Sequence, residues 1–174
     1  GVAVLTAAMH AGALAAGATR DLLEPNRLFR MAVAWIAIKT LHEFGHAFAV
    51  RAWGGAVHEV GVVFLVFFPV PYVDASAASG IPDKRKRMAV GAAGIAIELF
   101  VTALALFAWI LLEPGAVRSF CYDVIWIGGV STLFFNGNPL LRYDGYFVLA
   151  DAIEIPNLDA RSRDFLAYLA QRHL

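Results

Sequence analysis

The chain has 174 residues, 60% of them hydrophobic and only 16% charged, and its mean hydropathy is +0.66. A soluble domain is closer to half apolar and a quarter charged, so this composition favours a membrane protein over a buried soluble helical core. Lysine plus arginine equal aspartate plus glutamate at 14 each, which argues against a nucleic-acid binder, and the single cysteine excludes an internal disulfide or a Cys-rich zinc site.

Four apolar stretches are predicted to be helices that cross a lipid bilayer. They are residues 1–19, which resemble the remnant of a span, and residues 31–50, 88–112 and 119–141. The third of these runs for 25 positions with one charge, Glu98. Because the chain begins inside an apolar stretch without an initiator Met, we expect it to be a piece of a longer protein.

Two further segments are predicted to lie outside the spans. Residues 60–73 are too short for a span, rich in Val and Phe and interrupted by Pro69 and Pro71, which indicates a β-hairpin at the membrane surface. Its free edge could accept an extended peptide, although a hairpin that only plugs the helix bundle is the alternative. Residues 158–174 place apolar side chains on one helical stripe and predict an amphipathic helix.

The distribution of basic residues predicts the orientation of these spans. Residues 51–87 and 142–174 together hold nine lysines and arginines, whereas residues 20–30 and 113–118 hold four. The positive-inside rule therefore places the first two segments in the cytoplasm. This gives a multi-pass protein of the bacterial inner membrane, with residues 84–87 on the cytoplasmic side.

The segment LHEFGHAF, residues 41–48, places His42, Glu43 and His46 in apolar surroundings, where titratable groups are costly. Positions i and i+4 of a helix share one face, so both imidazoles can bind one zinc ion. The glutamate beside them can take a proton from a water molecule that the ion activates. The spacing predicts a catalytic zinc site, and the alternative is a pair of buried histidines without a metal.

A catalytic zinc ion needs a third protein ligand. Ala49 and Ala52 occupy the positions at which many soluble zincins have a glycine and the third histidine. Topology offers Asp144 instead. His46 lies roughly 7 to 8 Å inside the cytoplasmic end of its helix, and Asp144 follows the 119–141 span as it returns to that side.

The motif NGNPLLRYDG interrupts that last span with Gly137 and Pro139 just before the aspartate. Irregular backbone at membrane depth is tolerated only where it lines a buried or water-filled cavity. With HEFGH on one predicted span and AAGIAIE at the start of the next, the chain resembles the site-2 protease family of intramembrane zinc metalloproteases. The resemblance covers roughly residues 28–157 and is strongest to the bacterial peptide zinc metalloprotease branch, which is linked to peptide maturation and export.

The resemblance implies an all-α polytopic membrane protein. It would have a three-helix transmembrane protease core, a partial extra helix and a short membrane-associated β-hairpin. The resemblance also implies that His42, His46 and Asp144 bind Zn²⁺ and that Glu43 is the general base. Asn136 would hold the substrate backbone or the developing oxyanion, and a helix-end cap is the alternative role for this residue.

The chain departs from the family pattern at two places. Many members read AGP with an asparagine three residues after the proline, where this chain has AGIAIE ending at Glu98. Many also read DGG, where this chain has Asp144, Gly145 and Tyr146. Neither departure changes a predicted metal ligand, so both bear on how a substrate is handled.

Lys39 and Glu98 are predicted to pair within the membrane. Both lie roughly 16 to 18 Å from the cytoplasmic end of their spans, and charges at that depth usually pair. The alternative is a protonated Glu98 bonded to backbone, with Lys39 in a water-filled cavity.

The function predicted from the sequence is hydrolysis of peptide bonds in membrane-embedded or membrane-associated polypeptides by a zinc-activated water. Residues 1–157 would form the transmembrane metalloprotease domain and residues 158–174 a helix leading to further sequence. The alternative is a membrane metal transporter, or a catalytically inactive zinc-binding scaffold linked to peptide export. The predicted partners are the lipid bilayer, the peptide substrate and an export or regulatory protein.

Overall fold

The structure is a computed structural model that describes residues 1–18 and 24–173, and it is mostly helical. The α-helices are α1 (Val2–Met9), α2 (Ala11–Ala18), α3 (Pro25–Ala52), α4 (Lys84–Leu111), α5 (Ala116–Val130), α6 (Asp144–Ile153) and α7 (Leu158–His173). The other elements are strands β1 (Val60–Leu65) and β2 (Phe68–Val73), the 3-10 helix η1 (Ser76–Gly80) and the π-helix η2 (Ser131–Asn136).

Local sequence signals explain where the two long helices begin and end. Pro25 opens α3, where its missing N–H and fixed φ suit the first helical turn. After α3 the chain turns at Gly54, whose φ of 82° lies in the left-handed region that glycine adopts without strain. Asp83 precedes α4, and its carboxylate accepts a hydrogen bond from the backbone N–H of Arg85 at 2.8 Å.

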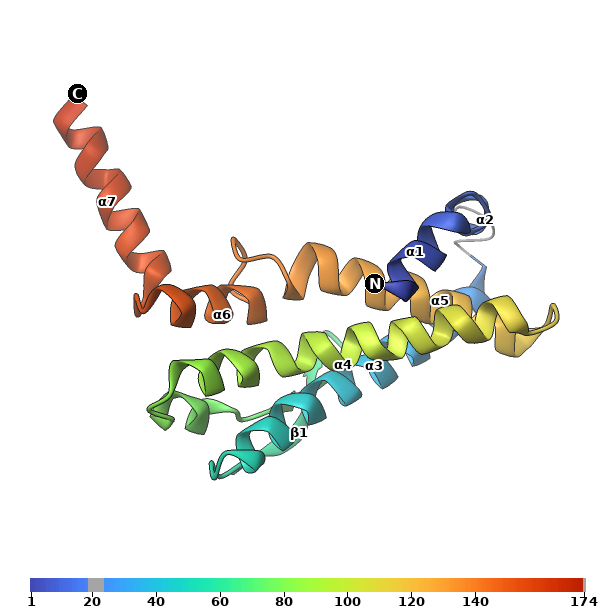
Figure 1. Cartoon of the computed structure of the whole chain (residues 1–174), viewed down its shortest axis with the longest axis horizontal. Helices are drawn as coiled ribbons and strands as arrows, with labels where there is room; N and C mark the ends of the chain where they lie inside the picture. The colour runs from blue at the N-terminus through green and yellow to red at the C-terminus, as the bar shows by residue number, and fades with distance from the viewer. Residues whose placement is uncertain (19–23, 174) are drawn as a thin grey trace.

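Helices α3, α4 and α5 pack against one another and form the body of the protein. Figure 1 shows α3 and α4 side by side, with α6 against α4 and α7 projecting away from the body. One buried apolar cluster lies where the three helices meet and contains Ala34, Ile38, Ala105 and Val124. A second cluster, Val50, Ile81 and Val90, closes the other end of α3 against α4.

The predicted β-hairpin is confirmed. Strands β1 and β2 pair antiparallel, with Leu65 opposite Phe68, and β2 packs along α3. The two turn residues, Val66 and Phe67, both have positive φ and are 85% and 95% exposed. A β-branched residue in that conformation is strained, and its side chain would be costly in water. The hairpin therefore presents an apolar tip.

The predicted set of spans is only partly found. Among the described residues, one helix, α4, is long and apolar enough to cross a membrane by length and composition. Helix α3 has 28 residues but carries five charged ones: Arg27, Arg30, Lys39, Glu43 and Arg51. The segment 119–141 is not one α-helix, because α5 ends at Val130 and continues as η2. The N–H of Gly137 bonds the carbonyl of Thr132 at 2.7 Å, a π-type contact that closes the helix before Pro139.

The two ends of the chain also refine the predictions. The first apolar stretch forms two short helices, α1 and α2, instead of one piece of a span, and residue 19 lies outside the described residues. The C-terminal stretch is helical as predicted, with residue 174 outside the described residues. Phe165 and Leu166 of α7 are more than half exposed, so its apolar stripe faces away from the body.

Candidate metal centre

Helix α3 carries the two histidines of the HEFGH motif on its buried face. His42 and His46 are 4% and 8% exposed, and their ring centroids are 4.9 Å apart. Their Nε2 atoms face each other at 3.2 Å. The i, i+4 spacing therefore aims two imidazole nitrogens at one point, as the sequence predicted.

The backbone of α4 fixes the protonation of one of these rings. His46 Nδ1 lies 2.8 Å from the carbonyl oxygen of Val90, which can only accept a hydrogen bond. Nδ1 must therefore carry the proton and donate it. In the tautomer with its proton on Nδ1, the ring presents the lone pair of Nε2 toward His42, which is the form that binds a metal ion.

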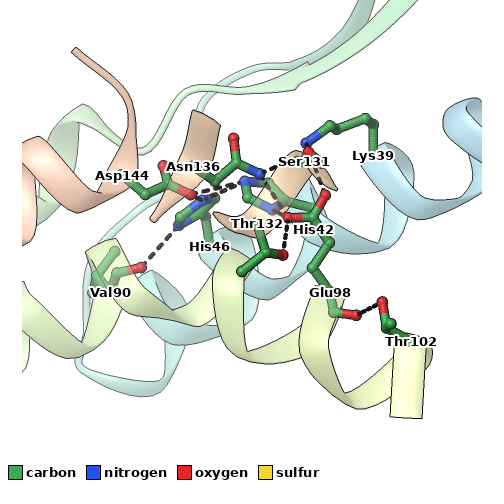
Figure 2. A network of polar contacts seen from close by, with 10 residues as sticks. All are labelled: Lys39, His42, His46, Val90, Glu98, Thr102, Ser131, Thr132, Asn136 and Asp144. Atoms are coloured by element: carbon green, nitrogen blue, oxygen red, sulfur yellow. Dashed lines mark hydrogen bonds and ion pairs between the residues drawn. The ribbon is translucent and has the colours of Figure 1, made fainter. Parts of the chain in front are cut away.

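Asp144, the first residue of α6, completes the group. Its Oδ2 lies 3.0 Å from His42 Nε2 and 3.4 Å from His46 Nε2, and Figure 2 shows the three side chains converging. Among the described residues, these three form the group of His, Cys, Asp and Glu side chains that could hold a metal ion, with ligand atoms within 4.8 Å of one another. Asp144 lies about a hundred positions after His46 in the sequence, and the fold brings the two side chains together.

The geometry of this group fits a tetrahedral ion. Ligand atoms at 2.0 to 2.1 Å from a tetrahedral zinc ion are about 3.3 Å apart. The three separations found here, 3.0, 3.2 and 3.4 Å, bracket that value. Asp144 Oδ2 is buried and has no hydrogen-bond partner within the described structure. A cation bound at this point would satisfy that oxygen.

Two glycines let α3 and α4 approach closely enough to build the centre. A Cβ at Gly94 of α4 would lie 2.5 Å from the Nε2 atoms of both histidines. A Cβ at Gly45 of α3 would lie 2.9 Å from the carbonyl oxygen of Ala93. Neither glycine had a predicted role, although Gly45 lies in HEFGH and Gly94 in AAGIAIE.

Glu43, His46 and Asp144 line a cavity of about 880 Å³. The cavity opens between β2, η1, α4 and α6. Glu43 Oε2 accepts a hydrogen bond from the backbone N–H of Val73, the last residue of β2, at 3.1 Å. The hairpin therefore sets the orientation of this carboxylate beside the metal ligands.

The predicted pairing of Lys39 with Glu98 is confirmed. Lys39 Nζ lies 2.8 Å from Glu98 Oε1 and donates to Ser131 Oγ at 2.6 Å. Glu98 is 0% exposed, and its Oε2 accepts from Thr132 Oγ1 at 3.0 Å and from Asn136 Nδ2 at 2.6 Å. Figure 2 shows this network beside the histidines. The hydroxyls of Ser131 and Thr132 were not singled out from the sequence.

Asn136 therefore has a definite contact in the structure. Its amide nitrogen donates to Glu98 and, at 3.4 Å, lies within hydrogen-bond range of Ser131 Oγ. Both of its N–H groups have acceptors inside the protein. A direct contact between this amide and a substrate, which the sequence predicted, would require it to exchange one of them and stays a prediction.

The chain was compared with protein-family models, with curated proteins and with solved structures, and none of them matches it.

Proposed function

We propose that the protein is an intramembrane zinc metalloprotease that hydrolyses peptide bonds in membrane-embedded or membrane-associated polypeptides. The observation that carries this proposal is the convergence of His42, His46 and Asp144 at tetrahedral separations, with Glu43 beside them. Two nitrogens and one oxygen, with no cysteine, suit a catalytic zinc ion that keeps one position open.

The ion, when bound, would supply Lewis-acid activation of a water molecule and of the scissile carbonyl. Glu43 would accept the proton of that water and deliver it to the leaving amide nitrogen. The Val73 N–H holds one carboxylate oxygen of Glu43 in place. The cavity in front of these residues admits a peptide segment, since its volume of about 880 Å³ is in the range of ligand sites.

Several features support a position inside the membrane. Helix α4 meets the length and hydropathy of a span. Large apolar side chains stand exposed on the outer faces of the other helices, where lipid would cover them. On α3 and η2 they are Phe29, Phe44, Phe48, Leu133 and Phe134. Together with the apolar hairpin tip, they support contact with lipid, and we extend the proposal to a chain that crosses the bilayer more than once.

Replacement of Glu43 by glutamine tests the proposed chemistry. The amide keeps the size of the side chain but cannot accept the proton, so Glu43→Gln should retain zinc and lose about 10²-fold or more of the cleavage rate. The measurement is cleavage of a transmembrane peptide by the purified protein, with zinc content determined in parallel. Cleavage at an undiminished rate would contradict the proposal. Zinc transport unaffected by the substitution would favour a metal transporter.

The proposed orientation has its own test. Lys86 is exposed in the basic run at the start of α4. A Lys86→Cys variant in a Cys121→Ala background should stay unlabelled when intact cells are treated with an impermeant thiol reagent, because the run is expected in the cytoplasm. Labelling from outside would show that the orientation is opposite to the one predicted.

A further inference from the structure

Glu98 stands out because a fully buried carboxylate is costly unless several donors compensate for the lost water. Its donors come from two elements, α3 and η2. Lys39 reaches it from α3, and Thr132 and Asn136 reach it from η2, at 2.6 to 3.0 Å. The opposite charge of Lys39, whose side chain is 15% exposed, compensates for the burial of this carboxylate inside the bundle.

The remaining neighbour of Glu98 is a metal ligand. Oε2 lies 3.5 Å from Nδ1 of His42, and that nitrogen is buried with no hydrogen-bond partner within the described structure. If Nε2 of His42 binds a cation, Nδ1 must carry the ring proton. Ligand histidines commonly donate that proton to a carboxylate, which fixes the ring and strengthens the metal bond. Glu98 is placed to be that acceptor after a small shift of either side chain.

Glu98 also holds the segment that leads to the third ligand. Asn136 ends η2, and the following loop returns to Asp144 at the start of α6. The loop closes tightly, because a Cβ at Gly145 would lie 2.7 Å from the carbonyl carbon and oxygen of Gly137. A carboxylate that binds Asn136 and Thr132 therefore restrains the base of this loop.

We propose that Glu98, charge-balanced by Lys39, is a positioning residue of the metal centre: it orients His42 and anchors the segment that carries Asp144. This inference rests on the proposed zinc site. It adds Glu98 and Lys39 as residues that support the ligands without binding the ion. It also gives a physical role to a glutamate at the position where the family that this chain resembles commonly has asparagine.

The test measures zinc affinity and thermal stability separately, by competition with a chromophoric chelator and by thermal unfolding of the purified protein. Glu98→Gln should weaken zinc binding about 10- to 100-fold. It should also change the visible absorption of the Co²⁺-substituted protein, which reports ligand geometry. The double variant Lys39→Met/Glu98→Gln has no unpaired buried charge and should regain stability without regaining zinc affinity, because the carboxylate acceptor is still missing.

Asp123→Asn is the matched control, since it removes a buried carboxylate of another ion pair. It should leave zinc affinity and the Co²⁺ spectrum unchanged. Native zinc affinity in Glu98→Gln, or recovery of affinity together with stability in the double variant, would overturn the positioning role and leave the proposed function standing. If Glu98→Gln does not fold, the charge-neutral double variant carries the test. A native chain that binds no zinc would overturn the proposed function and this inference together.

Discussion

The helix bundle buries one carboxylate, Glu98, near the middle of α4 and another, Asp123, on α5, and comparing them separates an ion pair beside the candidate metal centre from one that joins helices. Glu98 is 0% exposed and Asp123 is 1% exposed. Each pairs with cations from α3: Glu98 with Lys39, and Asp123 with Arg30 at 3.0 Å and Arg27 at 3.6 Å. By burial and charge alone the two sites are equivalent.

The partners are what differ. The Arg30 side chain is 34% exposed, so the pair at Asp123 reaches the surface of the protein, and it joins the first turns of α3 to the middle of α5. Glu98 instead lies 3.5 Å from His42, a candidate metal ligand, and binds the π-helix that leads to Asp144. A buried charge is therefore evidence for a functional site only when its neighbours are groups that could bind a metal ion or react. Ion pairs that only hold helices together are buried in the same way.

The largest effect should follow from removal of a metal ligand. His42→Ala, His46→Ala and Asp144→Ala should each lose most of the bound zinc, because three protein ligands are the minimum for such a site. Metal content of the purified variants measures this, with Asp123→Asn as the variant that should keep its zinc. Full zinc occupancy in Asp144→Ala would remove that residue from the proposed ligand set. The contacts of Glu98 with the segment before Asp144 would then no longer distinguish it from Asp123.

The next largest effect is expected on the stability that the Lys39–Glu98 ion pair contributes. Lys39→Met or Glu98→Gln should each cost about 3 to 5 kcal/mol, because one change leaves a buried charge or its donors without a partner. The double variant should recover part of this loss. Thermal or denaturant unfolding in detergent gives the double-variant cycle, and simple additivity of the two single changes would contradict a coupled pair.

A smaller loss of stability is expected at the Asp123 ion pair. Asp123→Asn should cost about 1.5 to 3 kcal/mol, since the bond from the Arg30 guanidinium is lost but that guanidinium is partly exposed and can be hydrated. The buried Arg27 keeps a second acceptor, the carbonyl oxygen of Gly17 at 3.3 Å. The same unfolding measurement applies. A loss equal to that of Glu98→Gln would show that the exposure of the cation does not distinguish the two pairs.

The sequence predicted the parts of the site that follow from local spacing or from position along the predicted spans. The spacing of His42 and His46 sets their common face, and the helix break at Pro139 predicted where Asp144 returns. Matched depth was enough to pair Lys39 with Glu98, and the composition of residues 60–73 was enough to predict a hairpin.

What the sequence could not supply depends on contacts between elements distant in the chain. The bond from Val73 to Glu43 requires the hairpin to lie against α3, and hydropathy carries no such information. The carbonyl of Val90 has no side-chain signature, although it sets the protonation of His46. The span prediction was least accurate at 119–141, where apolar composition conceals the change from α-helix to π-helix.

The smallest effect in free energy is expected from a single methyl group at the contact between α3 and α4. Gly94→Ala places a Cβ 2.5 Å from the Nε2 atoms of His42 and His46, so the rings or the helices must move. Overpacking of this kind costs about 1 to 3 kcal/mol, and the better helix propensity of alanine offsets up to about 1 kcal/mol of it.

The consequence for the metal site should exceed the consequence for stability, because the displaced atoms are the ligands themselves. Gly94→Ala should therefore lower zinc affinity even if the midpoint of unfolding changes little. Gly129 of α5 is the control, since a Cβ there would meet nothing within 4 Å. Gly129→Ala should keep zinc affinity and gain up to about 1 kcal/mol of stability. Equal zinc affinity in the two alanine variants would show that the approach of α4 to the histidines does not constrain the centre.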